Sequence, residues 1–168
     1  MPFPAKAVAN EFLKIARENG ETLTAMKLQK LVFYAHGWTL ALTDRPLISD
    51  PIEAWEWGPV IPALYHEFKR FGNGPITEKA HESSLHNLKL RVFIPTLENS
   101  GSGTERSIAQ AIVERIWDDY SAFSAARLSN ATHEAGTPWA DVYEPGKRHI
   151  RIPDPIIKKY FEGLVNAK

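Results

Sequence analysis

The sequence predicts a mainly α fold: one compact helical domain with a minor short β or extended element. Apolar residues recur with the spacing of a helix face in several stretches, and turn-forming glycines and prolines separate those stretches. A chain of 168 residues has the usual size of one domain. We find no internal repeat and no convincing linker, so we predict that residues 1–168 form a single domain.

Two helices are predicted at the start of the chain. The first should stop near Gly20, and its apolar face consists of Val8, Phe12, Ile15 and Ala16. Thr24 suits the N-cap of the second helix. The broad apolar stripe of that helix consists of Leu28, Leu31, Val32, Ala35, Thr39 and Leu42. Gly37 interrupts this stripe, which indicates either close helix packing or a local irregularity.

A short extended piece and a third helix are predicted next. The letters IEAWEW indicate an extended segment that ends at Gly58. Pro59 and Pro62 are both tolerated only in the first turn of a helix. The third helix should therefore run from about Val60 to Phe71, and Gly72 should cap its C-terminus.

The middle of the chain gives weaker signals. Residues 76–101 fit no single element, although the letters LKLRVFIP look extended and residues 98–103 look like a polar loop. Ser102 and Glu105 then form a capping-box pattern in front of an apolar series with helical spacing. This pattern predicts a helix that begins just after Ser102.

Two more helices are predicted toward the C-terminus. A break near Tyr120-Ser121 should separate the capped helix from a helical stretch that runs from Ala122 to about His133. Asp154-Pro155 should open a last amphipathic helix. Its apolar residues are Ile156, Tyr160, Phe161 and Leu164.

Composition excludes several classes of site and partner. Twenty basic and twenty acidic residues give a formal net charge of zero, so nothing favours nucleic acid or an anionic membrane in general. The sequence contains no cysteine, which excludes disulfides, thiolate zinc sites and cysteine nucleophiles. We see no signal-peptide pattern and no apolar window long enough to span a membrane. We therefore expect a soluble, cytoplasmic protein.

No pattern of catalytic residues stands out. The zinc pattern HExxH is absent, because no second histidine follows His133 four residues later. Ser129 and His133 lie four residues apart with Glu134 beside them, a spacing that could serve a nucleophile and its base. No glycine-rich nucleophile elbow surrounds Ser129, however, and these side chains suit hydrogen bonds at a helix end equally well. We predict no enzymatic activity, no metal and no other cofactor.

An aromatic cluster is the strongest candidate for a contact surface. It consists of Trp55, Trp57, Tyr65, Phe68 and Phe71, with Lys69 and Arg70 beside it. Tryptophan, tyrosine and arginine are enriched at the energetic centres of protein interfaces. Burial in the core and a groove for single-stranded nucleic acid are the alternatives. On a true strand Trp55 and Trp57 would share one face with Glu53.

Three ordered stretches of the sequence resemble the Panacea antitoxin domain, also called the SocA-like or GepA phage-associated family. They are KLQKLVFYAHGW, PLISDPIEAWEWGPV and LSNATHEAGTPW. The first matches the family pattern except for Phe33, which replaces a tyrosine. In the third, the spacing between His133 and Pro138 is slightly longer than the family pattern. The resemblance covers about residues 5–165.

This resemblance implies an antitoxin that neutralises a cognate protein toxin by direct contact. A member of the family is instead an adaptor that delivers its toxin to a Clp-type protease, and this is the main alternative. An uncharacterised hydrolase that uses Ser129 and His133 is a further alternative. We expect toxin contacts from Trp57, Tyr65, Phe68, Lys69 and Arg70. We expect Glu53, Trp55, Thr132, His133 and Trp139 to order the scaffold as a polar latch.

Overall fold

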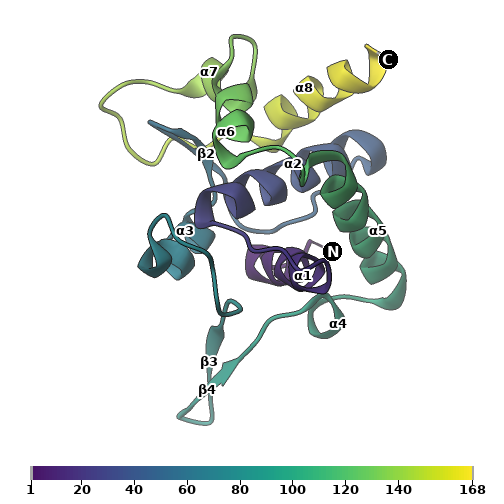
Figure 1. Cartoon of the computed structure of the whole chain (residues 1–168), viewed down its shortest axis with the longest axis vertical. Helices are drawn as coiled ribbons and strands as arrows, with labels where there is room; N and C mark the ends of the chain where they lie inside the picture. Colours follow the sequence, from purple (N-terminus) through teal and green to yellow (C-terminus); the bar gives the residue numbers. More distant parts are fainter. Residues whose placement is uncertain (1, 168) are drawn as a thin grey trace.

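The structure is a computed structural model that describes residues 2–167, and it confirms the mainly α-helical fold (Figure 1). Short 3-10 and strand elements supplement the helices within the described residues. The helices are α1 Ala5–Glu18, α2 Ala25–Thr43, α3 Pro62–Phe68, α4 Leu97–Ser100, α5 Gly103–Tyr120, α6 Ala125–His133, α7 Pro138–Val142 and α8 Asp154–Asn166. The other elements are the strands β1 Glu53–Trp55, β2 Gly58–Val60, β3 Glu82–His86 and β4 Lys89–Phe93, and the 3-10 helix η1 Lys69–Phe71.

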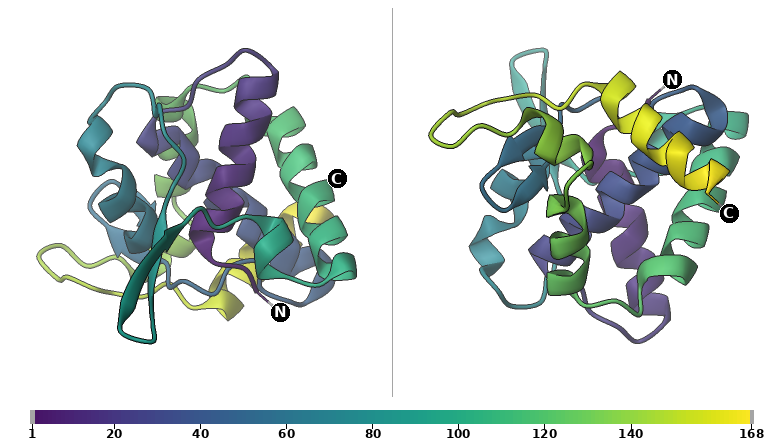
Figure 2. Two further views of the ribbon diagram at one scale, coloured as in Figure 1. Left: turned by 90° about the horizontal axis from the view of Figure 1, so that it is seen from below. Right: turned by 90° about the horizontal axis from the view of Figure 1, so that it is seen from above.

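Helix α2 is the centre of the molecule. It lies between α1 and α8, while α3 and α5 pack on opposite sides of it (Figures 1 and 2). Its buried residues occupy every face, as expected of a helix that is surrounded by others. The hydroxyl of Thr24 accepts a hydrogen bond from the backbone N–H of Lys27 at 3.3 Å, so the predicted N-cap is confirmed. None of the described helices is both long enough and apolar enough to cross a membrane.

Gly37 allows α8 to approach α2 closely. A Cβ atom at this position would lie 2.1 Å from Cε2 of Phe161, which no real contact permits. Phe161 is fully buried, and its ring meets those of Phe33 and Trp38 edge to face. The interpretation of Gly37 as a site of close helix packing is therefore confirmed.

The predicted third helix begins too early in the chain. Val60 belongs to β2 and pairs with Glu53, and the helix starts at Pro62, which occupies its first turn. The regular helix ends at Phe68 and continues as η1, after which Gly72 adopts a positive φ of 55°. The C-terminal stop is therefore as predicted, whereas the start is wrong because a strand pair uses Val60.

Caps explain the remaining differences from the sequence prediction. Residues 98–103 are not only a loop, because Thr96 and Asn99 form a capping box that opens α4. The stretch expected from Ala122 begins instead at Ala125, since Ser124 caps α6. Helix α7 was not predicted at all, although Thr137 caps it. The capping box before α5 is confirmed, with Ser102 and Glu105 as its two members.

The extended segment around residues 89–93 is one arm of an antiparallel hairpin. Strand β4 pairs with β3, which the sequence did not reveal, and the hairpin projects from the helical body at the bottom of Figure 1. The other hairpin, β1–β2, lies near α6 toward the opposite end of the molecule. Each hairpin forms its own two-stranded sheet.

Candidate functional site

The β1–β2 hairpin presents an exposed tryptophan at its turn. Glu53 pairs with Val60 and Trp55 pairs with Gly58, so Glu56 and Trp57 form the turn between the strands. The expected short extended segment is therefore confirmed for Glu53–Trp55, but it ends earlier than predicted because the chain reverses before Gly58. Trp55 and Trp57 do not share a strand face: Trp55 is half-buried, while the side chain of Trp57 is 71% exposed.

Two neighbouring residues of α2 hold the second half of this hairpin from inside. The side-chain amide of Gln29 donates to the carbonyl oxygen of Ile61 and accepts from its N–H, both at 2.9 Å. The ammonium of Lys30 donates to the carbonyl oxygen of Pro59 at 3.0 Å. All four residues are buried, so these side chains replace the backbone partner that a neighbouring strand would supply.

Side chains of α6 and α7 hold the turn from the other direction. The indole Nε1 of Trp139 donates to the carbonyl oxygen of Trp55 at 2.6 Å. The hydroxyl of Ser129 donates to the carbonyl oxygen of Trp57 across a longer distance of 3.4 Å. Alternate carbonyl oxygens along the hairpin thus each accept a side-chain hydrogen bond. They belong to Trp55, Trp57, Pro59 and Ile61.

Gly58 lies where these supports converge, and only glycine fits there. Its φ of 113° lies in the region that side chains disfavour. A Cβ here would lie 2.9 Å from Nζ of Lys30, 3.0 Å from Cε1 of His133 and 3.1 Å from Oγ1 of Thr132. Both the backbone conformation and the lack of space therefore require glycine.

Lys30 is a buried cation without a carboxylate partner. Its side chain is 2% exposed, and within residues 2–167 it takes part in no ion pair. Burial lowers the pKa of Lys30 to about 8, because desolvation disfavours the charged form. Burial of the Lys30 ammonium therefore costs electrostatic free energy, even with its hydrogen bond to Pro59. This cost indicates that Lys30 serves to fix the hairpin.

His133 is locked in one orientation. Its Nδ1 lies 2.6 Å from the carbonyl oxygen of Ser129, so Nδ1 carries the proton and donates. The ring packs edge to face on Trp139 at 4.5 Å between centroids. Thr132 donates to the same Ser129 oxygen at 2.6 Å. The Nε2 atom of His133 is buried without a hydrogen-bond partner among the described residues.

This geometry does not form a nucleophile and its base. A serine nucleophile needs its hydroxyl within hydrogen-bonding reach of the histidine ring. Here the Ser129 hydroxyl bonds the Trp57 carbonyl, and His133 bonds the Ser129 backbone. Nor does any group of three or more His, Asp or Glu side chains within residues 2–167 have the arrangement of a metal site.

Glu53 supports the first strand of the hairpin. It is buried, and its Oε1 accepts from the indole of Trp55 at 3.1 Å and lies 3.3 Å from Nδ1 of His149. The Trp55 ring in turn packs edge to face on Tyr65 at 4.8 Å. The five residues expected to order the scaffold therefore all lie against this hairpin or within it. They are Glu53, Trp55, Thr132, His133 and Trp139.

Four of the five residues expected to contact a partner are exposed. Trp57 lies at the hairpin turn, and Tyr65, which is 43% exposed on α3, packs on Trp55 of the same hairpin. Lys69 follows Tyr65 by one helical turn, and Arg70 comes next and pairs with Glu78 at 3.0 Å. We call the set Trp57, Tyr65, Lys69 and Arg70 the Trp57 surface.

Phe68 does not belong to this surface. Its side chain is 1% exposed, and it shares the inward face of α3 with Leu64, four residues earlier. The expectation that Phe68 contacts a partner is wrong for the folded chain, because the ring is part of the core.

Two parts of the site were not predicted from the sequence. One is a cleft beside β1, and the other is the pair of α2 side chains, Gln29 and Lys30, that support the hairpin. The cleft has a volume of about 510 Å³, and Trp55, Tyr143 and the cations Lys147 and Arg148 help to line it. The basic run at residues 147–149 was its sequence signal. Gln29 lies within the letters KLQKL, but their spacing does not reveal contacts made some thirty residues away.

Comparison with known proteins shows which family the sequence matches. Residues 28–140 match the family described as antitoxin SocA-like, Panacea domain. The antitoxin SocA of Caulobacter vibrioides (strain NA1000 / CB15N) is 32% identical over 164 residues, which cover 94% of this chain and 81% of that protein. No solved structure matches. The matched range contains the β1–β2 hairpin and every side chain that supports its carbonyl oxygens.

Proposed function

Because the chain belongs to the family of SocA-like antitoxins with a Panacea domain, we propose that it neutralises a cognate protein toxin by binding it directly. The observation that carries this proposal is the exposed Trp57 on a hairpin whose backbone is held by buried side chains. An exposed tryptophan on a fixed backbone loses little conformational freedom on binding. It is therefore suited to anchor an interface.

The Trp57 surface has the composition of an interface centre with a charged rim. Trp57 and Tyr65 supply the aromatic contact area, and Lys69 and Arg70 lie one turn farther along the chain. Tyr65 is backed by Trp55, which is itself tied to Glu53 and Trp139. In this proposal the surface covers the active region of the toxin, and the encounter takes place in the cytoplasm.

Co-expression tests the proposal directly. The chain is expressed together with the product of the gene adjacent to its own, and growth and co-purification are measured in the same cultures. Restored growth with a stable complex supports neutralisation by contact. Toxicity that persists although the chain is folded and abundant contradicts it.

A second host separates the proposed mechanism from proteolytic delivery. An adaptor needs the protease, whereas an occluding antitoxin does not. We therefore expect rescue to persist in a host that lacks its Clp-type proteases, with the toxin present at full level in the complex. Loss of rescue in that host, together with toxin accumulation, would instead identify the chain as an adaptor.

A further inference from the structure

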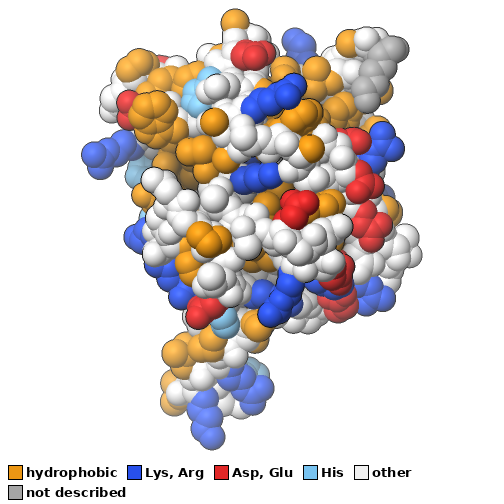
Figure 3. Space-filling view, viewed as in Figure 1, with side chains coloured by type: hydrophobic (Ala, Val, Ile, Leu, Met, Phe, Trp, Pro, Cys, Tyr) orange, Lys and Arg blue, Asp and Glu red, His pale blue; other side chains and the backbone are white. Residues whose placement is uncertain are grey.

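The β3–β4 hairpin projects from the helical body and almost all of it is exposed (Figures 1 and 3). From Ser83 to His86 and from Lys89 to Phe93 every residue is exposed. A two-stranded hairpin with no layer packed on it is only marginally stable in water. We therefore expect a partner to cover the β3–β4 hairpin.

One face of this hairpin is apolar. Leu85 pairs directly with Leu90, and Ser83 pairs with Val92, so these four side chains lie on the same face. Leu85 and Leu90 are both 69% exposed, although directly opposed apolar residues usually mark a face that packs on something. Contiguous exposed apolar area of this kind marks interaction sites on soluble proteins.

The other face carries the cations toward the tip, and Glu82 and Phe93 at its base. His86 pairs with Lys89, and Arg91 pairs with Ser84 on the same face. The sequence contains no acidic residue from Ser83 to Leu97, and neither Lys89 nor Arg91 forms an ion pair within the described residues. At the bottom of Figure 3, hydrophobic side chains line one side of the projection and Lys and Arg side chains gather toward its tip.

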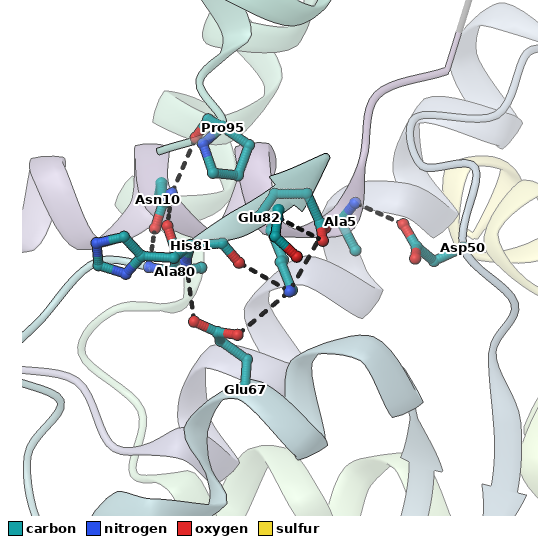
Figure 4. A network of polar contacts seen from close by, with 10 residues as sticks. Ala5, Asn10, Asp50, Glu67, Ala80, His81, Glu82 and Pro95 are labelled. Carbon is teal, nitrogen blue, oxygen red and sulfur yellow. Dashed lines mark hydrogen bonds and ion pairs between the residues drawn. The ribbon is translucent and has the colours of Figure 1, made fainter. Parts of the chain in front are cut away.

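The base of the hairpin is held rigidly by α1. The amide of Asn10 is buried, and its Nδ2 donates to the carbonyl oxygens of Ala80 at 3.0 Å and Pro95 at 2.8 Å (Figure 4). Its Oδ1 accepts from the N–H of Ala80 at 2.7 Å. The buried Asn10 side chain thus binds the two segments that flank the strands, and this fixes the direction in which the exposed strands point.

Helix α3 connects this base to the Trp57 surface. Glu67 accepts from the N–H of His81 at 2.9 Å and forms an ion pair with Lys6 at 3.2 Å. Arg70 pairs with Glu78, which lies in the segment that leads into the hairpin. Because α3 lies between the two hairpins in Figure 1, one partner can run from Trp57 along α3 to the β3–β4 hairpin.

The turn between β3 and β4 contains an exposed leucine, Leu88, at a position whose backbone conformation favours glycine. Asn87 and Leu88 have φ values of 49° and 61°, the signs of a type I′ turn, which favours Asn-Gly. A left-handed conformation is unfavourable for a residue that carries a Cβ atom. The Leu88 side chain is nevertheless 93% exposed, so it has no use inside the fold.

We propose that the β3–β4 hairpin is a second toxin-binding element, which places its apolar face and Leu88 in a hydrophobic groove with an acidic rim on the toxin. This inference rests on the proposed antitoxin function. Charge favours this occupant: Lys89 and Arg91 form no ion pair among the described residues, so carboxylates on the toxin would complement them. A second copy of the hairpin would bring the same cations, and its one acid, Glu82, already pairs with Lys6 at 3.4 Å.

Two apolar variants test the proposal against the purified product of the adjacent gene. Leu85→Thr combined with Leu90→Thr keeps residues that favour strands but removes the apolar pair. Leu88→Gly restores the preferred turn while it deletes the apolar tip. We expect each to raise the Kd for the toxin at least about 10-fold, the effect of losing one significant interface contact. Leu88→Gly should do so without lowering the melting temperature.

Charge and a matched control complete the design. Lys89→Glu combined with Arg91→Glu should slow association and weaken its dependence on salt. Leu42→Thr changes a leucine that is also exposed but lies on α2, and it should leave the Kd unchanged.

Unchanged toxin binding by all three hairpin variants overturns the inference while the antitoxin function stands. Absence of binding by the unaltered chain overturns both. The unaltered chain could instead form a dimer that the hairpin variants do not form. If this dimer and the monomeric variants bind toxin with the same Kd, a second copy covers the hairpin, and this also overturns the inference.

Discussion

The indole Nε1 of Trp139 lies 2.6 Å from the carbonyl oxygen of Trp55 and donates a hydrogen bond to it. This contact joins α7 to the hairpin that presents Trp57, across more than eighty residues of sequence. The ring of Trp139 packs on both His133 and Tyr143, with 4.5 Å between centroids in each pair. The indole therefore cannot turn away from Trp55 without breaking both ring contacts.

Removal of this one donor should destabilise the fold. Trp139→Phe keeps an aromatic ring in contact with His133 and Tyr143 but leaves the carbonyl oxygen of Trp55 without its partner. We expect the free energy of unfolding to fall by about 1–3 kcal/mol, measured by urea denaturation. The matched control is Trp57→Phe, which removes an exposed indole and should change the value by less than about 0.5 kcal/mol. Equal values for the two variants would contradict the supporting role of Trp139.

Gly58 should tolerate alanine far less well than another glycine with positive φ. Gly58→Ala introduces backbone strain and a Cβ within 2.9 Å of Nζ of Lys30. Gly136 has a φ of 83°, but a Cβ added there would meet no atom within 4 Å, so Gly136→Ala carries the strain alone, about 1–2 kcal/mol. We expect a clearly larger loss of stability for Gly58→Ala. A melting temperature equal to that of Gly136→Ala would show that the hairpin can move away from α2 freely.

Two helical glycines should respond to alanine in opposite directions. Gly163→Ala in α8 meets no atom within 4 Å and should raise the free energy of unfolding by roughly 0.5–1 kcal/mol, because alanine favours the helix. Gly37→Ala in α2 gains the same propensity but drives a Cβ into the ring of Phe161. It should therefore destabilise, since the core cannot absorb the added atom. Stabilisation by both substitutions would mean that α2 and α8 are not packed as closely as described.

Lys30 should make stability rise with pH above neutrality. Its pKa is lowered to about 8 in the folded chain, against about 10.4 in an unfolded one. Below about pH 8 the lysine is charged in both states, and the cost of burying the charge is fully present. Between these two pKa values the unfolded chain binds more protons than the folded chain, so the free energy of unfolding rises by up to about 1.4 kcal/mol per pH unit.

The variant Lys30→Met isolates this effect. It keeps an unbranched side chain of similar length in the core but removes the titrating group. Urea denaturation at about pH 7.5 and about pH 9.5 should show a rise for the unaltered chain relative to Lys30→Met, because the other titrating groups are common to both. Parallel values for the two proteins across this range would contradict the buried, unpaired state of Lys30.

Local chemistry explains which elements the sequence predicted correctly. Thr24 and Ser102 each cap a helix through a bond to a residue three positions away, so the signal lies within a few letters. The β1–β2 turn has no such signal, because Glu56 and Trp57 are not typical turn residues and the positive φ falls on Gly58. The sequence therefore indicated one extended piece where the chain makes two short strands.

The candidate site was only partly accessible from sequence for a different reason. The exposed Trp57 and the buried Phe68 are both large aromatics, and composition alone does not distinguish an anchor from a core residue. The pairing of Phe68 with Leu64 at helical spacing could have placed it inside. The bonds from Gln29 and Lys30 to the hairpin join residues about thirty positions apart, and only the fold brings them together.

Binding of the toxin by the Trp57 surface can be measured through the affinity of one double variant. Trp57→Ala combined with Tyr65→Ala removes two exposed rings, so the fold and its melting temperature should be retained. We expect the Kd for the purified toxin, measured by calorimetry, to rise by at least about 30-fold, as loss of one interface anchor worth about 2 kcal/mol requires. An unchanged Kd for this folded variant, under conditions where the unaltered chain binds, would contradict the account.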